Sequence, residues 1–153
     1  LAPGSEKVFC EIDCHVGYSI ARVDSGGPVA EGASRLWIVT VRTRFDETTI
    51  SPERGREAPL QPSPRLVLLR DAAGAVHGDL SGALSVDSGS TPLTTPLRPG
   101  ESYLTRFRFE LPAGVPPDAL LLEDADGISA ALIGHERSPW HGKVLLALPA
   151  PAA

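Results

Sequence analysis

The sequence lacks features that several protein classes require. It has no methionine and no asparagine, and the absence of asparagine removes every N-glycosylation acceptor. No apolar run approaches the roughly 18 residues that a membrane span needs. The chain has 19 acidic and 14 basic side chains and no basic run, so we expect no nucleic-acid partner. Aromatic residues are only 5% of the chain, which disfavours a stacking platform for glycans.

The common catalytic motifs are missing as well. There is no nucleophile elbow, no phosphate-binding loop and no His-Glu-x-x-His pattern. Ser25, Ser88 and Ser138 fall in predicted loops without an identifiable base partner. We therefore expect a protein that is not an enzyme and has no cofactor, and that binds or assembles with a protein partner.

The residues that are present predict an all-β protein. Glycine and proline number 15 each and are spread along the chain, which is typical of short strands joined by turns. Apolar and polar residues alternate over 8–20, 36–45 and 102–111, and shorter apolar runs occupy 65–70, 76–80, 84–86, 120–122 and 143–148. We predict an antiparallel immunoglobulin-like β-sandwich of seven to eight strands. It would span residues 7–148, with a linker at 1–6 and a flexible tail at 149–153.

Three segments resemble a known group of domains. The stretch from Leu97 to Pro112 contains a Pro-Gly-Glu turn that leads into an alternating strand ending in Leu-Pro. It looks like a strand of bacterial telokin-like, immunoglobulin-like extracytoplasmic domains, as do Arg42–Asp46 and Ile133–His141. The resemblance implies a secreted or membrane-tethered module of unassigned function, and it brings no catalytic residue. Since the chain begins at Leu1, we also expect that it has been trimmed. A membrane tether outside the given residues is compatible with this expectation.

Both cysteines lie in one short stretch, Cys10-Glu11-Ile12-Asp13-Cys14-His15. If this stretch were a straight strand, the two thiols would lie on one face about 13 Å apart at ~3.3 Å per residue. A disulfide needs Cα atoms within roughly 7 Å, so the two cysteines would then be separate buried thiols, with His15 on the opposite face. If residues 11–13 turn instead, the two sulfurs can meet and His15 can join them.

The turned geometry allows three kinds of site. The first is a disulfide between Cys10 and Cys14. The second is a copper or zinc site formed by Cys10, Cys14 and His15 and completed by His135 or His141, because thiolate and imidazole suit these metals. Covalent haem is a third alternative, which the β pattern disfavours. The binding surfaces of a module without such a site would be the long loop 46–64 and the strand edges.

Overall fold

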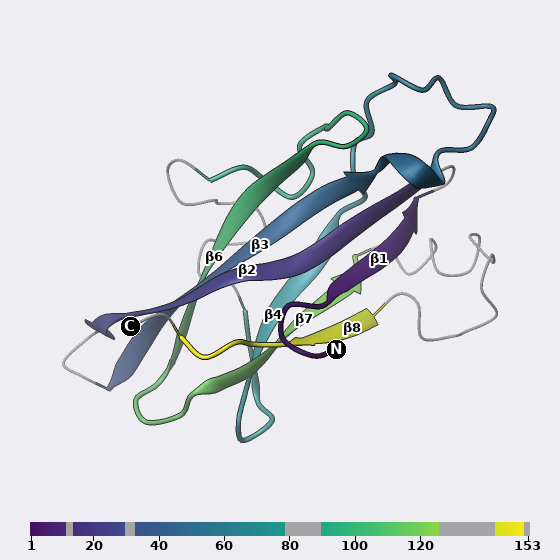
Figure 1. Cartoon of the computed structure of the whole chain (residues 1–153). Helices are drawn as coiled ribbons and strands as arrows, with labels where there is room; N and C mark the ends of the chain where they lie inside the picture. The colour runs from purple at the N-terminus through teal and green to yellow at the C-terminus, as the bar shows by residue number, and fades with distance from the viewer. Residues whose placement is uncertain (12–13, 30–32, 79–89, 126–142, 152–153) are drawn as a thin grey trace.

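The computed structural model describes residues 1–11, 14–29, 33–78, 90–125 and 143–151. These residues form two antiparallel sheets of four strands each, which confirms the predicted β-sandwich (Figure 1). The first sheet has the order β1-β2-β3-β6, and the second has the order β5-β4-β7-β8. The elements are β1 (Glu6–Glu11), β2 (Cys14–Val29), β3 (Ser34–Asp46), the 3-10 helix η1 (Glu47–Thr49), β4 (Arg65–Asp71), β5 (Val76–Gly78), β6 (Ser102–Pro112), β7 (Pro117–Asp124) and β8 (Lys143–Ala147).

The long strands of the first sheet alternate between the core and the outside. On β3, Trp37, Val39, Val41 and Phe45 face inward and are buried, whereas Arg42 on the other face is exposed, as the sequence predicts. The second sheet supplies the opposite half of the core with leucines in register, among them Leu69, Leu120 and Leu146. The core therefore lies between the two sheets and consists mainly of aliphatic and aromatic side chains, although some polar residues such as Glu11 and Thr43 are buried as well.

The turn that precedes β6 has the geometry its residues predict. Glu101 N donates to the Arg98 carbonyl oxygen at 3.0 Å, and Gly100 has a φ of 78°. Proline in the second position and a left-handed glycine in the third are the requirements of a type II turn. The positive φ favours glycine at this position, and a Cβ there would also force the Glu47 carboxylate to move.

β2 differs from the sequence prediction in two respects. The alternation over 8–20 predicted either one half-buried strand or two strands meeting at a bulge near Gly17, but β2 runs through Gly17, and its register shifts fall between Ile20 and Arg22 and between Ser25 and Pro28. The segment 24–28, Asp-Ser-Gly-Gly-Pro, is typical of a turn that ends a strand, yet β2 continues to Val29, because a bulge accommodates the glycines and proline. The predicted weak strand at 84–86 lies outside the described residues.

The two ends of the described chain meet at β8. The amino group of Leu1 donates to the Leu145 carbonyl oxygen at 2.7 Å, and Ala147 N donates to the Leu1 carbonyl oxygen at 2.9 Å. The described residues form no helix with the length and apolarity that crossing a membrane would require.

Candidate functional site at the end of the β1–β2 hairpin

The cysteine-containing stretch turns. β1 and β2 pair antiparallel, with Cys10 opposite His15 and Glu11 opposite Cys14. The chain therefore reverses between Glu11 and Cys14, and a straight strand through both cysteines is excluded. Cross-strand partners share a face of the sheet, whereas consecutive residues alternate. Cys10 and His15 accordingly lie on one face, and Glu11 and Cys14 lie on the other.

This reversal separates the two thiols instead of joining them. Cys14 is only 3% exposed and belongs to the core, while Cys10 is partly exposed on the outer face of the sheet. The predicted disulfide is not formed, and both residues are thiols. The physical reason is the position of the turn: with Cys10 and Cys14 on opposite faces, their Cα–Cβ vectors point apart, and a bridge would require the backbone to move.

On the outer face, Cys10 contacts a histidine. Its Sγ lies 3.0 Å from Nε2 of His15, which is the distance of a hydrogen bond between the thiol and the ring. His15 is in turn the cross-strand partner of Asp46 on β3. Three neighbouring strands thus present a thiol, an imidazole and a carboxylate in one row across the sheet.

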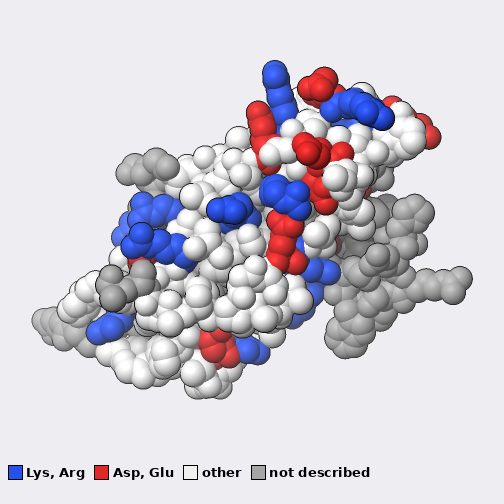
Figure 2. All heavy atoms as spheres, viewed as in Figure 1, with Lys and Arg blue, Asp and Glu red and all other residues white. Residues whose placement is uncertain are grey.

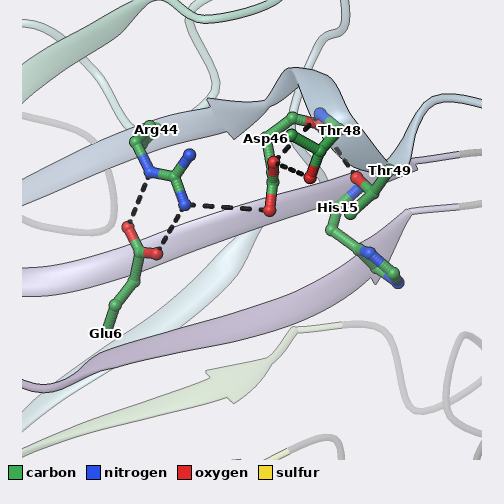
Figure 3. A network of polar contacts seen from close by, with 6 residues as sticks. All are labelled: Glu6, His15, Arg44, Asp46, Thr48 and Thr49. Atoms are coloured by element: carbon green, nitrogen blue, oxygen red, sulfur yellow. Dashed lines mark hydrogen bonds and ion pairs between the residues drawn. The ribbon is translucent and has the colours of Figure 1, made fainter.

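Asp46 does not complete this row as the third member of a catalytic triad. Its Oδ1 accepts hydrogen bonds from Thr48 N at 3.1 Å and from Thr48 Oγ1 at 2.7 Å, and Arg44 lies 3.8 Å from Oδ2 (Figure 3). The Thr48 hydroxyl is the main cause that lowers the pKa of Asp46, and the charge of His15 contributes less. The His15 ring points away from Asp46 (Figure 3). The carboxylate is therefore a nearby negative charge, not a hydrogen-bond partner of the ring.

Backbone contacts fix the position of His15. Its N–H donates to Oγ1 of Thr49 at 3.0 Å, and that hydroxyl donates to the Asp46 carbonyl oxygen at 2.9 Å. η1 follows β3 directly, so it places Thr49 against the first residues of β2 (Figure 1). The backbone of His15 is thus held against the end of β3, and the contact of its ring is with Cys10.

A further ion pair crosses the sheet beside this row. Glu6 on β1 reaches over β2 and accepts two hydrogen bonds from Arg44 on β3, at 3.1 and 2.7 Å (Figure 3). Gly17 on β2 lies between them, and a Cβ at this position would collide with the Glu6 side chain. The glycine is therefore what lets a side chain of β1 reach β3.

The inner face at the same point carries a buried charge cluster. Arg65, whose side chain is 2% exposed, donates to Glu11 Oε1 at 2.8 Å and also pairs with Asp124. Ser63 donates to Glu11 through its N–H at 3.3 Å and its hydroxyl at 2.6 Å. The guanidinium carbon lies 4.5 Å from the ring centre of Phe9, where the positive charge faces the ring. This cluster joins β1 of the first sheet to β4 and β7 of the second.

The outer face of the first sheet also concentrates arginines. The register aligns Arg22 with Thr40 and Arg106, and it aligns Arg42 with Leu104. Figure 2 shows the basic groups over β2, β3 and β6. The charged residues at paired positions of this face are the basic Arg22, Arg42, Arg44, Arg106 and Arg108 and the acidic Glu6, Asp24, Asp46 and Glu110. Five positive and four negative charges give this face a balance of +1, against -5 for the whole chain.

Sequence reasoning found only part of this site. It singled out Cys10, Cys14 and His15, of which the structure brings Cys10 and His15 together and moves Cys14 away. It missed the Glu11–Arg65–Asp124 cluster, although one signal was present: Glu11 shares the alternation phase of buried Phe9. It also missed the partnership of His15 with Asp46, because β2–β3 register cannot be read from the residues.

The predicted metal site stays a prediction. Within the described ranges, no three His, Cys, Asp or Glu side chains are arranged to hold a metal ion. His135 and His141, which were predicted to complete the site, lie outside the described residues.

Comparison with known proteins supports the fold. No protein-family model matches the chain, and no curated protein matches it either, so the telokin-like resemblance is not confirmed. Among solved structures, the chain is similar to MPT63, a secreted protein from Mycobacterium tuberculosis. The TM-score is 0.51 at 17% identity, over 84% of this chain and 91% of that chain. At this identity the likeness extends to the fold alone.

Proposed function

We propose that this protein is a non-enzymatic binding module that works outside the cytoplasm and contacts an acidic protein partner. The binding surface is the outer face of the β1-β2-β3-β6 sheet. The observation that carries the proposal is the set of arginines in register on this face of an otherwise acidic chain. Arginine is enriched at protein interfaces because its planar guanidinium pairs with carboxylates and packs on flat surfaces.

Exposed apolar side chains on the same face suit a protein partner better than a simple anion. Leu104 on β6 is 47% exposed beside its partner Arg42, and Val8 on β1 is 37% exposed. A protein surface can cover such side chains, whereas a small anion cannot. The extracytoplasmic location is supported by the secreted protein that shares the fold.

The absence of enzymatic activity is supported by the hydrogen bonds of Asp46. The row of Cys10, His15 and Asp46 has the residue types of a nucleophile, base and orienting acid. Thr48 and Arg44 already bind the carboxylate, so it does not orient the imidazole. Turnover of ester, peptide or glycan substrates that is abolished by Cys10→Ser or His15→Gln would contradict the proposal.

Site-specific photo-crosslinking tests the binding face. A benzophenone side chain would replace Leu104 on the proposed face or Leu66 on β4 of the other sheet, which is equally exposed at 45%. We expect a defined crosslinked protein from position 104 only, and we expect Arg42→Glu with Arg106→Glu to abolish it. Equal crosslinking from both positions, or crosslinking that is unaffected by the charge reversal, would overturn the assignment of the face.

A further inference from the structure

The outer end of the β1–β2 hairpin places one thiol where it can react and the other where it cannot. Cys10 is partly exposed, and its Sγ is 3.0 Å from Nε2 of His15. Cys14 is 3% exposed and faces the core. A thiol reacts as its thiolate, so a base within hydrogen-bond distance and access for the reagent both favour Cys10.

We propose that Cys10 is a thiol–disulfide exchange site that takes a small thiol as a mixed disulfide, with His15 as the proton acceptor. This inference does not depend on the proposed partner protein. It requires only the contact between Cys10 and His15 and the separation of Cys14.

The exchange balances without a further reagent. Cys10 Sγ–H transfers its proton to Nε2 of His15, and the thiolate attacks one sulfur of a small disulfide, R–S–S–R. A Cys10–S–S–R bond forms as the R–S–S–R bond breaks, and the electron pair leaves with R–S⁻, which takes the proton from the imidazolium. Cys10 is oxidised and one R–S group is reduced, so the small disulfide is the only oxidant needed.

The surroundings of the thiol support this chemistry. β1 is an edge strand, and Val8, on the same face as Cys10, offers an exposed apolar contact for a short carbon chain. The Thr49 contact fixes the backbone of His15 opposite Cys10.

The fold reverses the order of reactivity that the sequence would give. In an unfolded chain His15 is adjacent to Cys14, so the imidazole favours that cysteine. In the folded chain the β1–β2 register places His15 opposite Cys10, so the imidazole favours Cys10 instead. The mixed disulfide should also persist, because Cys14 on the opposite face cannot attack it to form an internal disulfide.

The test is the reaction of the reduced, folded protein with 2-hydroxyethyl disulfide, followed by intact mass and peptide mapping. We expect one 2-mercaptoethanol adduct, on Cys10, forming at least about tenfold faster than any adduct on Cys14. In urea the preference for Cys10 should be lost, and Cys14 should react at least as fast as Cys10, because His15 is then adjacent to Cys14. Similar rates in the folded protein, or conversion of the adduct into a Cys10–Cys14 disulfide, would overturn the proposal.

A histidine variant tests whether Cys10 reacts faster because His15 accepts its proton or only because Cys10 is exposed. His15→Gln should slow the Cys10 adduct about tenfold or more, while His77→Gln on β5, far along the chain in the other sheet, should leave the rate unchanged. Circular dichroism would establish that each variant is folded. An unchanged Cys10 rate in folded His15→Gln would contradict the role of the imidazole. If that variant does not fold, the ratio of the two rates in the wild-type protein decides the proposal.

Discussion

The two faces of the sheet at the β1–β2 hairpin have different chemistry, although adjacent residues supply them. On the outer face, Cys10 and His15 form a partly exposed pair beside a charged surface. On the inner face, Cys14 packs in the core, and Glu11 binds the buried Arg65. At this hairpin, the position of the turn decides which of the neighbouring residues share a face and can act together.

The largest expected effect concerns the inner face. Arg65→Met leaves the carboxylates of Glu11 and Asp124, whose side chains are only 7% and 14% exposed, without their cation, so we expect a loss of about 3–5 kcal/mol in the free energy of unfolding. The matched control is Arg22→Met, because Arg22 pairs with Asp24 but is 62% exposed, and its loss should cost at most about 1 kcal/mol. Urea denaturation measures both. Equal losses would show that the cluster does not hold the sheets together.

Substitution of the two cysteines should likewise cost more stability on the inner face than on the outer face. Cys14→Ser places a hydroxyl in the apolar core and should cost about 1–3 kcal/mol. Cys10→Ser, on the outer face, should cost under about 1 kcal/mol. Thermal or urea unfolding of the reduced proteins measures the difference. A larger loss of stability for Cys10→Ser than for Cys14→Ser would contradict the burial of Cys14 in the core.

The inner face should also respond to alkaline pH. Burial raises the pKa of Tyr18 well above its ordinary value and raises that of Tyr103 to about 12, and these are the only two tyrosines. Their contribution to stability is therefore complete below the unfolded pKa of about 10 and is lost as the pH rises through the folded values. Absorbance at 295 nm should show no tyrosine ionisation near pH 10 in the folded protein, whereas in urea the ionisation should be centred near pH 10. Titration near pH 10 without denaturant would contradict the burial of both rings.

The smallest effect tests the outer face. Gly17→Ala should displace Glu6 from Arg44 at a cost under about 1 kcal/mol, because the pair is partly exposed. In that background Glu6→Gln should have no further effect. Gly27→Ala, where a Cβ meets nothing within 4 Å, is the matched control. If Glu6→Gln costs as much stability in the Gly17→Ala background as in the wild-type protein, the ion pair between Glu6 and Arg44 does not depend on Gly17.

The sequence predicted the fold better than the site. Alternation on β3 and β6 gave their inward faces, because one side of each strand packs in the core. The same rule failed across Glu11 and Cys14, because apolar and polar residues continue to alternate through the reversal. The pairing of Arg65 with Glu11 could not be predicted from the sequence either, since contacts between sheets depend on how the two layers are stacked. Predicting that the arginines share one face requires the register of β2, β3 and β6, which the sequence of a single strand does not reveal.

The most direct test of the account is a native-state alkylation experiment on the two thiols. The folded, reduced protein would be treated with light iodoacetamide, then unfolded and treated with an isotopically heavy form, and the peptides would be mapped by mass spectrometry. We predict the light label on Cys10 and the heavy label on Cys14. Light label on both cysteines, the reverse assignment, or neither label because of a disulfide would contradict the separation of the two thiols by the hairpin.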